Sequence, residues 1–205
     1  SSGTAALHLG LLAQKLPLGR VAVNVAPSQL LRPEFPGLVD QVLRDSGLAA
    51  EHLEVEITED ALSGDEAAAD RAVRDLKALD VQIAIDDFGA GYSSLGRLKN
   101  LAVDRLKIDR QFISQIANNG RDAALSRAII DMATALGMHV TAEGVEAAEQ
   151  IQQLQPRNRV DVQGFLFSHP MPENDAAAFL RRLHENTTVL RLARLYDIPI
   201  VGTNH

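Results

Sequence analysis

Polar residues with useful chemistry stand at the ends of six predicted strands, where a purely structural strand would not need them. Four of them are acids, and four carboxylates that lie close together must either take up protons or hold cations. Only one Lys accompanies them, so bound metal is the better explanation, and oxygen ligands favour Mg²⁺ or Mn²⁺ over zinc or copper. The residues are Asn24, Glu56, Asp86, Asp87, Lys107, Glu143 and Gln163.

An adjacent acid pair such as Asp86-Asp87 suits two ions, because one carboxylate can bridge both ions while the other binds one. Two ions about 3.5–4 Å apart are a widespread device for displacement at a phosphodiester. Leu106 and Ile108 flank Lys107 and would point to the opposite face of a strand. The Lys107 side chain therefore faces either the centre lined by strand ends, where acids would balance its charge, or the helices.

Each residue taken alone also has a simpler explanation. An acid at a strand end is usually a helix cap or a solvated charge, Glu59 and Asp60 could cap the following turn, and Lys107 could lie on the surface. Six consecutive strand ends are harder to explain in this way. The sequence at 89–91 does not fit a dinucleotide loop, because two Asp precede it and no third Gly opens a helix. The six His residues show no metal-ligand spacing and there is no Gly-x-Ser-x-Gly elbow, which argues against zinc and a serine nucleophile.

Short β-branched runs alternate with helical patterns and would position these side chains. The spacing predicts strands over 21–25, 53–58, 81–85, 103–108, 139–142 and 160–163. It predicts helices over 7–15, 35–47, 65–79, 95–99, 122–136, 147–154 and 172–184. This alternation indicates an α/β fold of six parallel βα units, either a barrel or an open sheet, in one domain. Ligands bind at the carboxyl ends of the strands in such folds, so the six strand ends would meet at one mouth.

The composition is that of a globular chain. Its 205 residues are 46% hydrophobic and 23% charged, which excludes disorder, collagen and coiled coil as overall descriptions. The formal charge of −7 argues against a nucleic acid polymer as partner, but not against a small phosphate ligand held through metal ions. There is no Cys, no apolar run near the ~18 residues of a membrane span and no visible signal peptide. We therefore expect a cytoplasmic domain, and the sequence leaves open a membrane tether elsewhere in the full protein.

Six sequence strings, in this order, resemble one known family. They are VAVNVAPSQL (21–30), EITE (56–59), DDFGAGYSSL (86–95), LKIDR (106–110), TAEGVE (141–146) and QGFLFSHP (163–170). Together they are similar to the EAL domain, the cyclic di-GMP-specific phosphodiesterase of bacterial signalling, from about Val21 to Leu183. The resemblance implies a TIM-like (β/α)8 barrel that hydrolyses cyclic di-GMP to linear pGpG. It also implies two Mg²⁺ or Mn²⁺ ions per site and inhibition by Ca²⁺.

The resemblance also assigns roles to residues. The matching metal ligands, among which Asp86 is the bridging carboxylate, are Asn24, Glu56, Asp86, Asp87 and Glu143. The matching catalytic residues are Lys107, which positions or activates the attacking water, Glu143, and Glu59, which anchors the loop after the Asp pair. The matching residues of that loop, which links the metal site to a dimer interface, are Phe88, Gly89, Gly91, Tyr92, Ser93 and Ser94. The matching ligand-contacting residues are Asp109, Glu146, Gln163 and Gly164.

The Glu-Ala-Leu sequence that names the family is missing. It should lie upstream of Asn24, so we expect the barrel to be N-terminally incomplete in this chain, with a barrel domain over 1–186 and a tail over 187–205. Truncation, completion by a partner chain or completion by that tail would each account for the missing strands. The missing Glu also favours an alternative function, a catalytically inactive cyclic di-GMP receptor. A purely structural domain would leave the acids at the strand ends unexplained. The family implies a homodimer and an upstream sensor or cyclase-like domain.

Overall fold

A computed structural model of the chain describes residues 20–89, 95–117, 120–154, 160–172 and 175. Within these residues six strands form one sheet in chain order, and each is parallel to its neighbours. They are β1 (Val21–Val25), β2 (Leu53–Thr58), β3 (Gln82–Phe88), β4 (Arg105–Ile108), β5 (His139–Ala142) and β6 (Val160–Val162). Because consecutive strands lie side by side, every crossover turns in the same direction, as in a barrel wall. The six predicted parallel βα units are confirmed.

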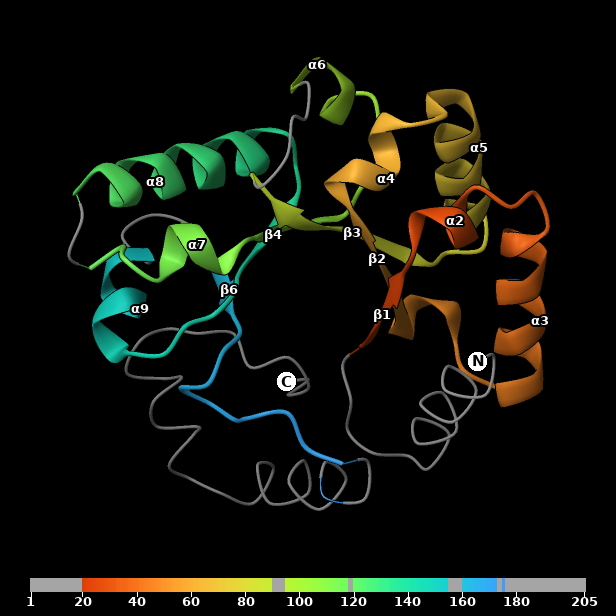
Figure 1. Cartoon of the computed structure of the whole chain (residues 1–205). Coiled ribbons are helices and arrows are strands. Elements are labelled where there is room, and N and C mark those ends of the chain that lie inside the picture. Colours follow the sequence, from red (N-terminus) through yellow and green to blue (C-terminus); the bar gives the residue numbers. More distant parts are fainter. Residues whose placement is uncertain (1–19, 90–94, 118–119, 155–159, 173–174, 176–205) are drawn as a thin grey trace.

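Helices cover the outer side of this sheet, which curves into an arc in Figure 1. The longer ones are α3 (Phe35–Ser46), α5 (Glu66–Lys77), α8 (Gly120–Ala135) and α9 (Ala148–Leu154). The short ones are α2 (Pro27–Leu30), the 3₁₀ turn η1 (Ala50–His52), α4 (Glu59–Ser63), α6 (Leu95–Leu98) and α7 (Arg110–Ile113). The helices predicted within 35–154 are confirmed to within about three residues at each end. The helix predicted over 7–15, nearly all of that over 172–184, and the tail over 187–205 lie outside the described residues, so the domain boundaries stay a prediction.

Strand alternation gives the sheet an apolar outer face and a charged inner face. On β2, Leu53, Val55 and Ile57 belong to the hydrophobic core, and Glu54 and Glu56 alternate with them. A fully buried Leu or Ile contributes about 1.5–3 kcal/mol, which is sufficient for the outer face to hold the helices. The inner face must instead satisfy its charges within the fold. The largest fully buried side chains of the core include Ile57, Leu76, Ile83, Ile85, Leu106 and Ile108.

The segments that follow β5 and β6 are joined through their backbones. Val145 N–H donates to the carbonyl of Gln163 at 3.0 Å, and Leu166 N–H donates to the carbonyl of Val145 at 3.0 Å. Gly164 lies between these two bonds, and a Cβ added there would stand 2.1 Å from the Val145 carbonyl oxygen. Only a residue without a side chain fits such a close approach of two backbones.

Described residues of the chain include no helix that is both long and apolar enough for a membrane crossing.

Gly164→Ala should lower the free energy of unfolding by about 2 kcal/mol or more, because the backbone it would strike cannot yield as a flexible side chain does. The measurement is urea denaturation followed by circular dichroism. Gly37→Ala is the matched control, since nothing lies within 4 Å of an added Cβ at this position of α3. Ala also favours a helix over Gly by about 1 kcal/mol. Equal effects of the two changes would contradict the proposed close approach.

Candidate active site

Lys107 lies at the centre of the charged inner face. Its Nζ contacts Glu56 Oε1 at 2.8 Å, Asp86 Oδ1 at 2.9 Å and Glu143 Oε1 at 2.7 Å. The Lys107 residue is only 4% exposed. Lys107 lies on β4 between two core residues, so its side chain points away from the helices. Of the two orientations that the sequence left open, the structure therefore shows the one toward the inner face. One ammonium thus gathers carboxylates from β2, β3 and the residue after β5.

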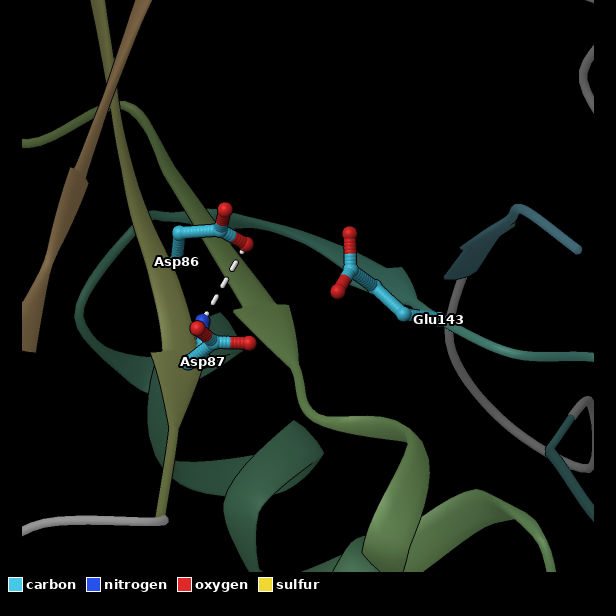
Figure 2. Close-up of side chains that lie close together, drawn as sticks. All are labelled: Asp86, Asp87 and Glu143. Carbon is cyan, nitrogen blue, oxygen red and sulfur yellow. Dashed lines mark hydrogen bonds between the residues drawn. The ribbon is translucent and has the colours of Figure 1, made fainter. Parts of the chain in front are cut away.

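A β-bulge brings the two adjacent Asp residues to the same side of the sheet. The register between β3 and β4 shifts across the Asp86–Asp87 pair, so these two residues stand opposite Lys107 alone. Asp87 has a φ of 53°, a left-handed conformation that Asp adopts more readily than most residues. In a regular strand the two carboxylates would point to opposite faces. Here one oxygen each from Asp86, Asp87 and Glu143 lie within 4.8 Å of one another. Figure 2 shows the carboxylate of Glu143 facing those of the two Asp residues.

The carboxylates of this cluster are harder to ionise than ordinary ones. Burial raises the pKa of Glu56 and of Glu143, and the nearby Lys107 ammonium opposes this only in part. Burial also raises the pKa of Asp87, and the adjacent Asp carboxylate and a hydrogen bond with Asp109 add to the effect. For Lys107, burial alone would lower the pKa, but the three carboxylates outweigh it and the pKa is raised. The cluster therefore holds a firmly charged ammonium among acids that release their protons less readily than ordinary carboxyl groups.

Glu59 lies behind the Asp pair, at the start of α4. It is 3% exposed, and its Oε2 accepts a hydrogen bond from Gly89 N–H at 3.0 Å. Gly89 has a φ of +97°, and a Cβ added there would stand 2.6 Å from the Phe112 ring. The segment that follows β3 is thus fixed at its first residue. Phe88 is buried at the end of β3, whereas the expected loop residues Gly91, Tyr92, Ser93 and Ser94 lie outside the described residues.

The remaining predicted residues are spread around this cluster. Asn24 pairs in register with Glu56 across β1 and β2, and its side chain is exposed. Asp109 caps α7, since its Oδ1 accepts from Gln111 N–H at 2.7 Å, and it also reaches Asp87. Glu146 and Gln163 are exposed, in the segments that follow β5 and β6. Of the five expected metal ligands, the structure therefore brings Asp86, Asp87 and Glu143 together, with Glu56 joined to two of them through Lys107.

A second charged layer beneath Lys107 was missed by the sequence reasoning. Arg105 Nε contacts Glu54 Oε2 at 3.1 Å, and Arg105 Nη1 bonds Asp161 and the hydroxyl of Thr141, the latter at 2.7 Å. Arg20 adds a second contact to Glu54 at 3.3 Å. The missed signal is a two-residue spacing, because Glu54, Arg105 and Asp161 each precede a predicted site residue by two positions and so share its face.

The sequence model of the EAL domain matches residues 4–170. The chain therefore belongs to the EAL domain family. Among curated relatives, the Cyclic di-GMP phosphodiesterase NbdA of Pseudomonas aeruginosa is 44% identical over 162 residues, which are 79% of this chain and 21% of NbdA. The chain spans about a fifth of the length of the curated relatives it matches first.

Solved structures of the family share the fold. The phosphodiesterase PaMucR in complex with c-di-GMP is 35% identical, with a TM-score of 0.76 over 83% of this chain and 71% of that one. BlrP1 of Klebsiella pneumoniae, in its manganese and calcium complexes with cyclic di-GMP, is 32% identical. Its TM-score is 0.73 over 82% of this chain and 43% of that one. These likenesses confirm the predicted TIM-like architecture of the EAL type.

Lys107→Met should lower the free energy of unfolding of the metal-free protein by about 3 kcal/mol. The change keeps the length of the side chain but leaves three carboxylates without their counter-charge. Urea denaturation in EDTA measures this effect. Lys99→Met is the control, because Lys99 is exposed. An unchanged midpoint for Lys107→Met would show that the ammonium does not hold the cluster together.

The raised pKa values of Glu56 and Glu143 also predict a pH dependence of stability. Above the ordinary value of 4.5, the folded protein still binds protons that the unfolded chain has released. The free energy of unfolding therefore falls as pH rises from 4.5 through the raised pKa values. In the double variant Glu56→Gln/Glu143→Gln this fall should be smaller, as urea denaturation in EDTA between pH 4.5 and 7 would measure. The control Glu51→Gln changes an exposed acid. If the free energy of unfolding changed with pH equally in the control and in the double variant, Glu56 and Glu143 would not be the source of the pH dependence.

Proposed function

We propose that this domain hydrolyses cyclic di-GMP to linear pGpG at the Lys107 cluster, with two Mg²⁺ or Mn²⁺ ions. The observation that carries the proposal is the bulged Asp86-Asp87 pair, whose oxygens lie within 4.8 Å of Glu143. Relatives support the substrate, since NbdA is a cyclic di-GMP phosphodiesterase and PaMucR was solved with c-di-GMP. BlrP1 supports the metals through its manganese and calcium complexes.

The donor set fits hard divalent cations. Among the described residues it consists of carboxylate oxygens, with Asn24 on the neighbouring strand, and it includes no His. Five carboxylates around one ammonium leave a formal charge of about −4, which two dications would neutralise. The carboxylates are those of Glu56, Asp86, Asp87, Asp109 and Glu143. Without cations this cluster would repel an anionic phosphodiester.

Each side chain has a task in the proposed reaction. Asn24, Glu56, Asp86, Asp87 and Glu143 would hold the two ions. When bound, such ions lower the pKa of water and stabilise charge on phosphate oxygens. Lys107 is placed to hold the attacking water and to offset charge that builds on the phosphate.

Residues around the cluster would orient the ligand and the ions. Glu59 holds the segment after the Asp pair through Gly89, and we assign Asp109, Glu146, Gln163 and Gly164 to contacts with the nucleotide. Ca²⁺ would inhibit, because it prefers longer and more numerous oxygen contacts than Mg²⁺. We further propose a homodimer that communicates with the site through residues 88–94. In the full protein an upstream sensor or cyclase-like domain would regulate it.

A direct assay separates this proposal from its alternative, a catalytically inactive receptor. The protein is incubated with cyclic di-GMP and Mn²⁺, and the nucleotides are separated by chromatography. The proposal predicts that pGpG accumulates and that EDTA abolishes its formation. Saturable binding of cyclic di-GMP without product, at full metal occupancy, would favour the receptor.

Asp86→Asn should lower turnover of cyclic di-GMP by at least about 100-fold. Changing a residue that only hydrogen-bonds to a metal ligand already lowers metal affinity or activity by about 10–100-fold. The amide keeps the shape of the side chain but cannot bridge two cations by charge. Asp75→Asn serves as the control, because Asp75 is exposed on α5. Circular dichroism verifies the fold of both variants. Unchanged turnover in Asp86→Asn would show that the metal assignment is wrong.

A further inference from the structure

Gln150 is a buried amide to which the proposed reaction gives no task. It is 6% exposed and is the third residue of α9. Its Oε1 accepts hydrogen bonds from Glu146 N–H at 2.7 Å and from Ala147 N–H at 2.9 Å. Its Nε2 donates to the carbonyls of Ile113 at 3.0 Å and Ser114 at 3.4 Å. Both ends of this side chain are therefore fully used.

These bonds join two segments that follow neighbouring strands. The first segment follows β4 and consists of α7 with its two capping residues, Asp109 and Ser114. We call it the Asp109 turn, and Ile113 and Ser114 are its last two residues. The turn is closed internally, because Asp109 caps it and Ser114 N–H donates to the Arg110 carbonyl at 2.8 Å. It is therefore a hydrogen-bonded unit with Asp109 at one end and the Gln150 contact at the other.

The second segment carries Glu143 and runs from the end of β5 to α9. It already presses against the first, because Gly144 has a φ of +67° and a Cβ there would stand 2.5 Å from Arg110 Cβ. Close packing limits how near the two segments come, but it does not prevent them from moving apart. Gln150 supplies that missing restraint, since pulling the segments apart would leave buried polar groups unpaired, at about 1–3 kcal/mol for each group.

We propose that Gln150 is a positioning residue that ties the Glu143 segment to the Asp109 turn and so sets the geometry of the cation site. This inference rests on the proposed function only for the cations. A residue that merely caps α9 would need the two bonds at Oε1, as in the second half of a capping box. The two bonds at Nε2 reach the neighbouring segment instead, and they are what distinguishes a tie between segments from a cap.

The test compares Gln150→Met, which removes all four bonds at nearly constant volume, with Gln152→Met, an exposed residue on the same helix. Hydrogen–deuterium exchange reports on residues 110–117 and 143–147, and electron paramagnetic resonance of free Mn²⁺ gives the metal affinity. We expect exchange in both segments of Gln150→Met to rise about tenfold and the Mn²⁺ dissociation constant to rise about tenfold. Gln152→Met should match the unmodified protein in both measurements.

Gln150→Glu is the second variant, for use if Gln150→Met does not fold. It keeps the acceptor for Glu146 and Ala147 N–H but loses the donor to the neighbouring turn. We expect exchange to remain slow at 146–147 and to rise at 110–117. The Mn²⁺ affinity should lie between that of the unmodified protein and that of Gln150→Met.

Two results would overturn the inference. One is unchanged Mn²⁺ affinity and unchanged turnover despite faster exchange, which would make Gln150 a structural residue alone. The other is exchange that does not change in the 110–117 segment, which would mean that Gln150 does not tie it. Failure of the unmodified protein to bind Mn²⁺ is a different result. It would contradict the proposed function and overturn the cation part of the inference, and the exchange comparison would still decide whether Gln150 joins the two segments.

Discussion

The ammonium of Lys107 and the carboxylates of Glu56, Asp86 and Glu143 depend on one another. Each acid comes from a different βα unit, and each contact is 2.9 Å or shorter. A buried charge without its partner is strongly unfavourable, so strands β2 to β5 must hold their register for any of these groups to be tolerated. Replacing such a cluster with apolar residues is often neutral or stabilising. Its presence is therefore better explained by what the carboxylates can bind than by any gain in stability.

The sequence predicts the six strands and the meeting of their polar ends, because alternation and parallel βα order are local signals that add up along the chain. It predicts the Asp86-Asp87 pair as ligands but not how both carboxylates can serve one site. Strict alternation would place them on opposite faces. The bulge and the left-handed conformation of Asp87 resolve this conflict. Both depend on the pairing of β3 with β4, about which the residue pattern of a single strand carries no information.

Two features around the site were not predicted from the sequence, for different reasons. Arg105 was within reach of sequence reasoning, since it lies two residues before Lys107 and therefore on the same face. It precedes the strand-end positions from which the site was predicted. Gln150 was not within reach, because the two bonds of its Nε2 go to backbone carbonyls 36 and 37 residues away in the chain. The charged cluster thus has a second ionic layer below it, and the hydrogen bonds of Gln150 join two segments beside it.

The most direct measurement of the central claim is the position of bound cations on the inner face. Crystals of the protein soaked in Mn²⁺ would be examined by anomalous diffraction at the manganese absorption edge. The account predicts two peaks about 3.5–4 Å apart, between the Asp86-Asp87 pair and Glu143 and within about 2.2 Å of their oxygens. A map without peaks at saturating Mn²⁺, or with peaks only on the outer surface, would contradict it.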